Sequence, residues 1–121
     1  MNLITGANGR IGNVVVRKLL EKGEKVRIFA RNTSNLSSLK GLEYEVANGD
    51  INDLQSVLMA MDGCDQVYHL AADININNKD ADKTFKINIQ GTENILQACI
   101  EKKVKRLVYV SSIHAFSLPP K

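Results

Sequence analysis

The residues Thr5-Gly6-Ala7-Asn8-Gly9-Arg10-Ile11-Gly12 decide the fold of this chain. They join an apolar run, Asn2–Thr5, to an amphipathic stretch, Ile11–Glu21, that ends at Lys22-Gly23. The run predicts a β-strand, and apolar residues at helical spacing followed by a glycine stop predict an α-helix. The apolar face expected for this helix comprises Ile11, Val14, Val15, Leu19 and Leu20. The glycine-rich segment is therefore a strand-to-helix junction.

A junction of this kind can bind a phosphate group. The free backbone N–H groups of a helix N-terminus point at an anion, and the helix dipole favours negative charge. We expect Gly6 to allow a sharp exit from the strand, Gly9 to let a pyrophosphate approach, and Gly12 to let the helix pack closely on the sheet. The alternative is a plain turn that only packs the helix. The predicted dinucleotide loop comprises Gly6, Asn8, Gly9, Arg10, Ile11 and Gly12.

The rest of the chain alternates between strand-like and helix-like segments. Strands are predicted at Lys25–Ala30, Leu42–Val46, Gln66–Leu70 and Arg106–Val110, and helices at Asp53–Met61 and Ala81–Lys102. The face expected to pack in the long helix comprises Phe85, Ile89, Thr92, Leu96 and Cys99. Gly91 within it costs about 1 kcal/mol relative to Ala, so we expect a close neighbour there. Right-handed crossovers predict an α/β fold, a doubly wound parallel sheet in the order 3-2-1-4-5.

Ligands of such a sheet bind at its carboxyl edge. The polar loops Arg31–Lys40 and Asp73–Asp80 follow predicted strands, and we expect them to border a ligand cleft. Arg31 stands where NAD-preferring enzymes usually place a carboxylate for the adenosine ribose. Since a guanidinium can pair with a 2′-phosphate, Arg31 favours NADP as the cofactor, with NAD possible and a surface arginine as the alternative.

Composition limits the remaining function classes. The 121 residues are 44% hydrophobic and 24% charged, with a net charge of +3, which excludes collagen-like, disordered and disulfide-scaffold chains. Because the chain has no Trp for bases to stack on, we expect no surface that binds nucleic acid. We expect the basic run Lys102–Arg106 to complement a helix C-terminus rather than to form a patch that binds polyanions. No apolar run approaches the roughly 18 residues that a transmembrane helix needs, so we expect a cytoplasmic protein. Cys64 and Cys99 are expected to be packed hydrophobes, with no metal site.

Four further motifs, in order along the chain, carry a resemblance to a known family. They are Gly49-Asp50-Ile51, His69-Leu70-Ala71-Ala72, Asn88-Ile89-Gln90-Gly91-Thr92-Glu93-Asn94-Ile95-Leu96 and Val110-Ser111-Ser112. Together with the Gly-x-x-Gly-x-x-Gly spacing, they resemble the extended branch of the short-chain dehydrogenase/reductase superfamily. That branch includes nucleotide-sugar epimerases and dehydratases and dihydroflavonol reductase-like enzymes. The resemblance implies a Rossmann-like fold and an NAD(P)-dependent oxidoreductase that transfers hydride on a carbonyl or alcohol substrate.

The resemblance also implies cofactor-binding roles. Asp50 would accept an adenine amino proton while the backbone of Ile51 frames the ring; a turn or cap is the alternative for Asp50. Leu70, Ala71 and Ala72 would border the dinucleotide where it crosses the sheet, or simply pack closely.

The implied active-site residues lie further along the chain. Asn88 would help to organise the active site, or else face solvent or bond locally. Ser112 would hydrogen-bond the reacting oxygen, with a strand-terminating Ser pair as the alternative, and His114 would face the substrate pocket. We expect His69, within an apolar strand, to be a structural histidine with satisfied hydrogen bonds.

The family completes catalysis with a Tyr and a Lys four residues later. Tyr44, Tyr68 and Tyr109 lack such a lysine. We therefore expect residues 1–121 to be the truncated, cofactor-binding N-terminal part of a longer enzyme, without its substrate lobe. A sheet edge left uncovered in this way predicts a homodimer or other self-association. The alternatives are an NAD-dependent sugar-nucleotide epimerase or dehydratase and a non-catalytic dinucleotide sensor.

Overall fold

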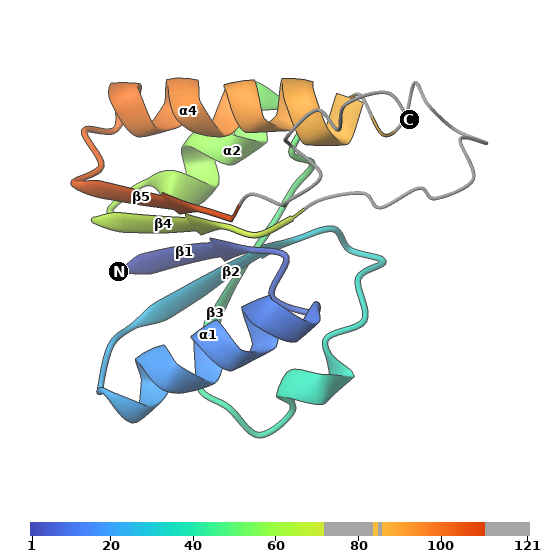
Figure 1. Cartoon of the computed structure of the whole chain (residues 1–121), viewed down its shortest axis with the longest axis vertical. Coiled ribbons are helices and arrows are strands. Elements are labelled where there is room, and N and C mark those ends of the chain that lie inside the picture. Colours follow the sequence, from blue (N-terminus) through green and yellow to red (C-terminus); the bar gives the residue numbers. More distant parts are fainter. Residues whose placement is uncertain (72–83, 85, 111–121) are drawn as a thin grey trace, which may run out of the picture.

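The computed structural model describes residues 1–71, 84 and 86–110, and its centre is a five-stranded parallel sheet (Figure 1). Its strands are β1 (Asn2–Thr5), β2 (Val26–Ala30), β3 (Glu45–Asn48), β4 (Gln66–His69) and β5 (Arg106–Tyr109). They lie in the order β3-β2-β1-β4-β5, which confirms the predicted topology. Because all pairs are parallel, the carboxyl ends of all these strands meet at one edge.

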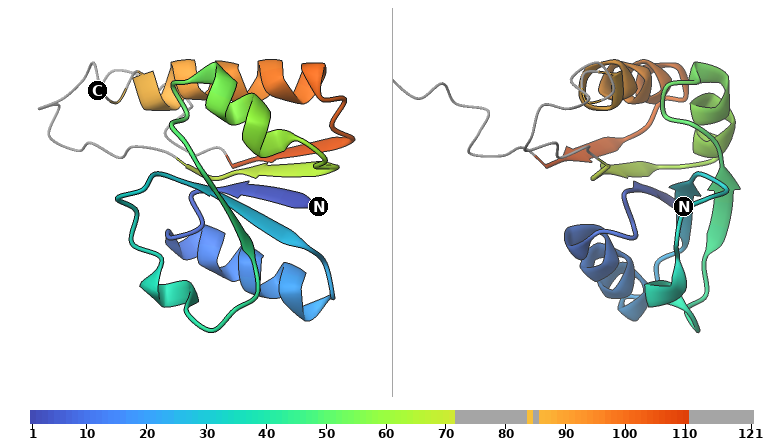
Figure 2. Two further views of the ribbon diagram at one scale, coloured as in Figure 1. Left: turned by 180° about the vertical axis from the view of Figure 1, so that it is seen from behind. Right: turned by 90° about the vertical axis from the view of Figure 1, so that its right-hand side faces the viewer.

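Helices cover both faces of the sheet (Figure 2). The helical segments are α1 (Arg10–Glu21), the 3-10 turn η1 (Ser37–Leu39), α2 (Leu54–Met61), the π-helical turn η2 (Lys86–Gln90) and α4 (Gly91–Glu101). Helix α1 lies on one face, whereas α2 and α4 lie side by side on the other. Among the residues that the structure describes, every helix is too short or too polar to cross a bilayer.

The central strand β1 is buried from both sides. Its neighbouring residues Leu3 and Ile4 point to opposite faces, and both are fully buried. Leu3 packs with Val67 and Ile95 beneath α2 and α4, and Ile4 belongs to a second core beneath α1. A strand covered on both faces carries apolar residues on both, and the adjacent Leu3 and Ile4 make β1 recognisable from its sequence.

The third strand begins later than predicted. The sequence predicts a strand over Leu42–Val46, but β3 spans Glu45–Asn48, in register with Arg27–Ala30 of β2. Leu42 and Tyr44 instead pack against the α1-side core from the segment that precedes the strand. Because β3 is an exposed edge strand, its own residues show no apolar pattern that marks its ends.

The buried faces of the helices match the prediction only in part, since Val15, Leu19 and Leu20 of α1 and Cys99 of α4 pack against the cores but other members of the predicted faces do not. In α1 the buried residues are Gly12 and Val16, while Ile11 and Val14 are each 56% exposed. In α4 they are Gly91, Ile95 and Ala98. Ile89 and Leu96, which the sequence assigns to the packed face of the long helix, are each 46% exposed. In both helices a closely packed glycine, Gly12 in α1 and Gly91 in α4, lies on the side that faces the rest of the protein, and the exposed apolar residues named above lie away from it.

The long helix Ala81–Lys102 is confirmed only in its described part. Within that part, α4 follows a wide π-helical turn, η2, that the periodicity did not predict. Close to this turn, the expected neighbour of Gly91 is the side chain of Ile51, whose carbons lie 3.0 Å from the position that a Cβ would occupy.

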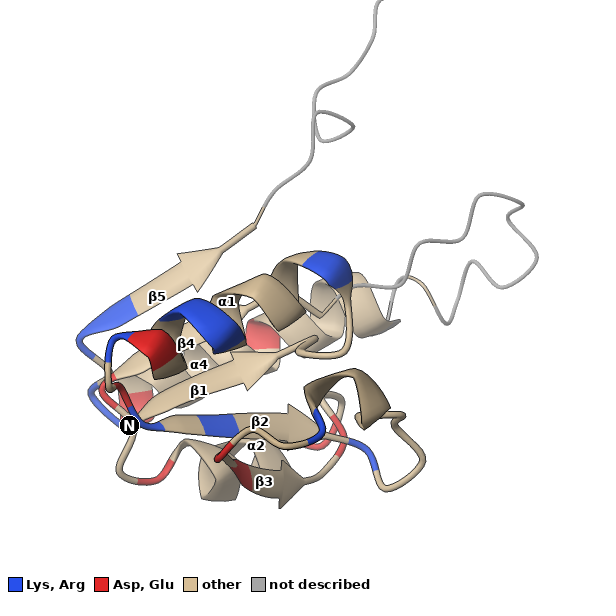
Figure 3. Cartoon of the chain, turned by 90° about the horizontal axis from the view of Figure 1, so that it is seen from below, with Lys and Arg blue, Asp and Glu red and all other residues tan. Residues whose placement is uncertain are grey.

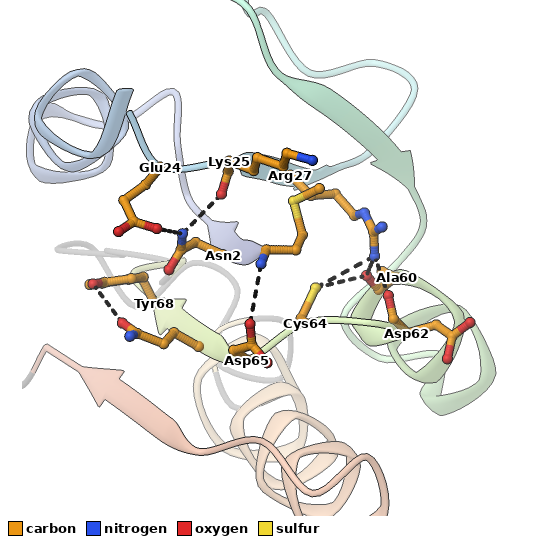
Figure 4. Close-up of polar contacts among 11 residues, drawn as sticks. Asn2, Glu24, Lys25, Arg27, Ala60, Asp62, Cys64, Asp65 and Tyr68 are labelled. Atoms are coloured by element: carbon orange, nitrogen blue, oxygen red, sulfur yellow. Dashed lines mark hydrogen bonds and ion pairs between the residues drawn. The ribbon is translucent and has the colours of Figure 1, made fainter. Parts of the chain in front are cut away.

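The amino edge of the sheet is held by polar contacts between β1, β2 and the end of α2 (Figure 4). One guanidinium nitrogen of Arg27 donates to the carbonyl oxygens of Ala60 and Asp62, each at 2.7 Å. At β1, Nδ2 of Asn2 donates to the carbonyl of Lys25 at 2.9 Å. These side chains make hydrogen bonds within the protein and so stabilise the fold. The carboxyl edge carries the candidate ligand site.

The cysteines and the charged residues behave as expected. Cys64 is buried in the core beneath α2, where burial raises the pKa of its thiol, and Cys99 packs against the same core. Basic and acidic residues are interspersed along the described ribbon (Figure 3). Lys102 is the residue that ends α4, as predicted, and its ammonium lies 3.5 Å from a carboxylate oxygen of Asp62.

Candidate functional site

The glycine loop folds back on itself at the carboxyl end of β1. Gly6 has a φ of +75°, a conformation that favours glycine, and a Cβ there would lie 2.7 Å from the backbone of Leu70 and Ala71. A Cβ at Gly12 would collide with the carbonyl group of Gly6. Gly6 makes the sharp exit from the strand that was expected, whereas Gly12 packs the helix on the loop rather than on the sheet. The two glycines thus allow the loop to pass between β4 and α1.

The first turn of α1 presents unhindered backbone at this edge. Gly9 precedes the helix, its N–H donates to the carbonyl of Gly6 at 3.1 Å, and no side chain caps the helix among the described residues. A Cβ at Gly9 would meet one atom, the Gly6 oxygen, at 3.4 Å. Asn8, Arg10 and Ile11 are exposed beside it. The arrangement provides N–H groups, a helix dipole and room for an anion.

The segment after β3 forms a tight turn that is attached to α4. The Asp50 carboxylate accepts a hydrogen bond from the N–H of Asn52 at 2.9 Å, so the turn-forming role that the sequence left open for Asp50 is present. The carbonyl of Ile51 accepts from the amide of Asn94 at 2.9 Å, and its side chain packs on Gly91. These contacts hold Asp50 and Ile51 at the carboxyl edge.

The loop after β2 carries Arg31 and is attached to α1. Arg31 is exposed, and its carbonyl accepts from the N–H of Ser34 in a turn. Further along, the Arg17 guanidinium donates to the carbonyl of Ser38 at 2.7 Å and to the Asn13 side chain at 2.9 Å. The Asn13 amide in turn donates to the Ser38 hydroxyl at 3.1 Å. A side-chain brace therefore anchors this loop to the helix that begins at the glycine loop.

His69 lies at the end of β4 with both ring nitrogens hydrogen-bonded. Nδ1 lies 2.8 Å from the hydroxyl of Thr5, and Nε2 lies 3.0 Å from the hydroxyl of Thr92. The side chain is 1% exposed, and burial lowers its pKa from 6.5 to about 4. The expectation of a structural histidine with satisfied hydrogen bonds is confirmed.

Thr5 and Thr92 are the residues of this region that sequence reasoning missed. Thr5 reads as an ordinary β-branched strand residue, and Thr92 as one position of a helical repeat. The available signal was the hydroxyl of Thr5 inside an otherwise apolar strand, because a buried hydroxyl needs hydrogen-bond partners.

Direct contacts join some of the predicted cofactor residues to their neighbours. The glycine loop adjoins Leu70 and Ala71, and Ile51 adjoins α4. Asn88 lies half-buried in η2, where its carbonyl accepts from the hydroxyl of Thr92 at 2.8 Å. Other predicted positions lie outside the described residues, namely Ala72, Ser112, His114 and the loop Asp73–Asp80.

Comparison with known proteins agrees with this geometry. The model of the NAD dependent epimerase/dehydratase family matches residues 2–121. Sterol demethylase protein B of Methylococcus capsulatus is 40% identical over 118 residues, covering 98% of this chain and 36% of that protein. Anthocyanidin reductase of Arabidopsis thaliana is 30% identical over 124 residues, covering 95% of this chain and 36% of that protein. The chain thus spans about a third of the length of these curated relatives.

A solved structure supports the same relationship. A short-chain dehydrogenase/reductase superfamily protein from Agrobacterium tumefaciens, with bound NAD, is 35% identical to the chain with a TM-score of 0.80. The match covers 93% of this chain and 32% of that one.

Proposed function

Because the chain belongs to the NAD dependent epimerase/dehydratase family, we propose that residues 1–121 are the dinucleotide-binding portion of an NAD(P)-dependent oxidoreductase resembling dihydroflavonol reductase. The observation that carries the proposal is the uncapped first turn of α1 beside Gly9, where a Cβ would meet only the Gly6 oxygen, so that the protein leaves this place open. The cofactor pyrophosphate would bind the N–H groups of this turn, next to Gly6 and Gly12. Asn8, Arg10 and Ile11, exposed around the turn, would line the same site.

The adenosine end of the cofactor would lie toward β2 and β3. Asp50 uses Oδ1 in its turn, and no described residue bonds Oδ2, which leaves that oxygen to accept an adenine amino proton. Arg31 would pair with a 2′-phosphate, which favours NADP over NAD, because no described ion pair engages its guanidinium. Leu70, Ala71 and Ala72 would border the cofactor where it crosses from β1 to β4.

The proposed chemistry is hydride transfer on a small carbonyl or alcohol substrate, for which a bound nicotinamide supplies or accepts the hydride. Ser112 would donate a hydrogen bond to the reacting oxygen, and His114 would face the substrate. Asn88 would help to organise the active site. The Tyr and Lys partners, together with a substrate lobe, would come from other parts of a longer protein. This proposal is supported by the lengths of the relatives, of which the chain covers about a third.

A specific observation favours each of two alternative functions. A sugar-nucleotide epimerase or dehydratase that uses NAD is favoured by the family description. A non-catalytic dinucleotide sensor is favoured by the lack of a Tyr-x-x-x-Lys sequence in these residues. Turnover assays with ketones and with sugar nucleotides, using the protein at its full encoded length, would separate the three.

Self-association is also part of the proposal. Met59 on α2 and Ile100 on α4 are 77% and 79% exposed, and a second copy of the chain would cover these apolar side chains. A stable monomer in sedimentation at high concentration would count against it. We further propose a cytoplasmic location, which cell fractionation tests.

The binding proposal is tested by calorimetric titration with NADPH and NADH. Gly9→Val should abolish binding of both, because its side chain would occupy the pyrophosphate position, whereas circular dichroism should remain that of the wild type. Glu43→Val, on the exposed segment before β3, serves as the control and should bind normally. Wild-type affinity in Gly9→Val would reduce the glycine loop to a structural turn.

A further inference from the structure

The hydrogen bonds of His69 connect three elements at the carboxyl edge. The ring belongs to β4, its Nδ1 contacts Thr5 at the end of β1, and its Nε2 contacts Thr92 in α4. On one side Tyr109 of β5 stacks on the ring, with a centroid distance of 5.6 Å. The imidazole is therefore held in place by packing as well as by its two hydroxyl partners.

The surrounding bonds determine where the ring proton lies. The hydroxyl of Thr92 donates to the carbonyl of Asn88 at 2.8 Å, so its oxygen must accept from Nε2–H. The hydroxyl oxygen of Thr5 accepts from the N–H groups of Leu70 and Ala71, each at 3.1 Å, and the Leu70 N–H also donates to the backbone carbonyl of Thr5 at 3.2 Å. Because a hydroxyl oxygen has two acceptor positions and one donor proton, Thr5 must donate to Nδ1. The chain of bonds requires a neutral ring with its proton on Nε2.

The two ends of this chain reach the proposed cofactor site. At one end, Leu70 and Ala71 form the backbone on which Gly6 packs, with a distance of 2.7 Å from the Ala71 nitrogen to the Cβ position of Gly6. At the other end, the Asn88 carbonyl belongs to the π-helical turn η2. A single imidazole thus connects the glycine loop with the turn that carries Asn88.

We propose that His69 is a positioning residue for dinucleotide binding, which holds the Leu70–Ala71 backbone against Gly6 through Thr5 and holds the Asn88 carbonyl through Thr92. This role rests on the proposed function. It does not involve proton transfer to substrate, since both ring nitrogens are engaged within the protein.

Protonation of the ring would break the arrangement. A proton on Nδ1 would point at the Thr5 oxygen, both acceptor positions of which are filled by backbone N–H groups. Thr5 and Thr92 are not titratable, and among the described residues the titratable group against the ring is Tyr109. No described carboxylate contacts the ring to compensate a positive charge, in agreement with the low pKa of His69.

A pair of substitutions separates the two nitrogens of the ring. The amide of Asn in His69→Asn reaches the position of Nδ1 and can accept from Thr5, whereas the amide of Gln in His69→Gln reaches that of Nε2 and can donate to Thr92. We expect His69→Asn to bind NADPH within about threefold of wild type. We expect His69→Gln and Thr5→Val to bind at least about tenfold more weakly. The Thr5 hydroxyl is then either no longer oriented by Nδ1 or absent, so the Ala71 N–H loses its acceptor, while the Leu70 N–H keeps the carbonyl of Thr5. A tenfold change in affinity corresponds to the loss of about one hydrogen bond.

Val67→Ala is the matched control for a loss of stability. Val67 lies two residues before His69 on the same face of β4 and is fully buried in the core, but it has no part in the chain of hydrogen bonds. All variants are measured at their full encoded length, at a temperature where circular dichroism shows them folded. If Val67→Ala weakened NADPH binding as much as His69→Gln does, the effect would be one of stability and the proposal would be overturned.

Two measurements do not depend on the cofactor. In wild-type protein, ¹⁵N NMR should show His69 neutral, with its proton on Nε2, and a proton on Nδ1 would overturn the proposal. Hydrogen exchange of the Ala71 amide should be slow in wild type and in His69→Asn but at least about tenfold faster in His69→Gln, since a weakened bond exposes the N–H. Unchanged exchange would overturn the positioning role, whereas wild-type protein that binds no dinucleotide would overturn the proposed function instead.

Discussion

Gly12, in the first turn of α1, packs directly on the carbonyl group of Gly6 at the end of β1. Any Cβ at Gly12 would meet backbone atoms, which cannot rotate away as a flexible side chain can. We therefore expect Gly12→Ala to lower the free energy of unfolding by about 3 kcal/mol, at the upper end of the usual cost of overpacking. Urea denaturation of the variant would measure this loss.

Gly9→Ala is the matched substitution in the same loop. Gly9 has a φ of −80° that any residue adopts, and its Cβ position is almost free of neighbours. We expect its effect on the free energy of unfolding to stay within about 1 kcal/mol, the range for changes at an N-cap position. Equal losses at both positions would show that the loop tolerates neither Cβ and would contradict the distinction between a packing glycine and a binding glycine.

Stability should depend on pH through His69. The unfolded chain protonates this histidine near pH 6.5, whereas the folded chain does so only near pH 4. Between these values the unfolded state binds more protons, so the stabilising contribution is complete above pH 6.5 and is lost as pH falls toward 4. The expected loss is about 3 kcal/mol, because each tenfold difference in proton affinity between the two states corresponds to about 1.4 kcal/mol.

The contribution of His69 is the difference in pH-dependent stability between wild type and a variant without this histidine, because carboxylates also titrate at low pH. Urea denaturation at several pH values should give a smaller slope between pH 6.5 and pH 4 in His69→Asn than in wild type. His114→Ala serves as the control for the second histidine of the chain. Parallel stability profiles for wild type and His69→Asn would contradict the burial of a neutral ring.

The topology was predictable because its signals are local. The buried strand β1 carries Leu3 and Ile4 at its centre, and Gly6 and Gly12, which follow it, mark backbone positions where a Cβ does not fit. The limits of β3 were not predictable, since the strand lies at an exposed edge and its register depends on pairing with β2. The rotation of α4 likewise follows from the close approach of Ile51 to Gly91, a contact between residues far apart in the sequence.

The candidate site was predictable to a similar degree. The glycine loop and Asp50-Ile51 appear as motifs, and the structure gathers them at one edge of the sheet. The partnership of Thr5, His69 and Thr92 was not predictable, because each hydroxyl suits its own element and only the parallel pairing of β1 with β4 brings Thr5 beside His69. The sequence pattern also contains no sign of the brace from Arg17 to Ser38, which joins a helix to an irregular loop.

Arg27 should matter more for stability than the carboxylate with which it pairs. Its guanidinium donates hydrogen bonds to the carbonyl of Ala60 in the last turn of α2 and to that of Asp62, the residue after the helix, and its Nε lies 2.9 Å from a carboxylate oxygen of Glu45. The Arg27 side chain is 20% exposed, whereas that of Glu45 is 58% exposed. We expect Arg27→Met to cost about 2–3 kcal/mol in urea denaturation, since the carbonyls of Ala60 and Asp62 lose a charged donor, and hydrogen bonds to charged groups contribute about 1.5–3 kcal/mol.

Glu45→Gln tests the ion pair alone. An exposed pair of this kind contributes less than about 1 kcal/mol, so this variant should be nearly as stable as wild type. A loss in Glu45→Gln as large as that in Arg27→Met would mean that the ion pair, rather than the carbonyl contacts, dominates.

Arg31→Ala should change cofactor preference. If the guanidinium binds a 2′-phosphate, its loss should weaken NADPH binding by about 1.5–3 kcal/mol, the range for hydrogen bonds to charged groups, and leave NADH binding nearly unchanged. Calorimetric titration with both dinucleotides measures the two affinities. Lys40→Ala, an exposed lysine at the far end of the same loop, is the control for a general loss of positive charge. Equal affinities of wild type for the two dinucleotides would contradict the NADP preference.

The brace between α1 and the Arg31 loop should act on the same preference from a distance. Arg17 and Asn13 hold Ser38 by two hydrogen bonds and are joined to each other by a third, and Ser38 lies in the loop that begins at Arg31. Arg17→Ala should let this loop move, so that Arg31 must be ordered when the 2′-phosphate binds. Because exposed hydrogen bonds of this kind contribute about 0.5–1.5 kcal/mol, NADPH affinity should fall by about threefold to tenfold. NADH affinity should not change, since NADH makes no use of Arg31.

Lys18→Ala removes the same charge from the neighbouring position of α1 without touching Ser38, and it should leave both affinities unchanged. A matching loss of NADPH affinity in Lys18→Ala would assign the effect to charge, and an equal loss for NADH in Arg17→Ala would assign it to the glycine loop instead of the brace.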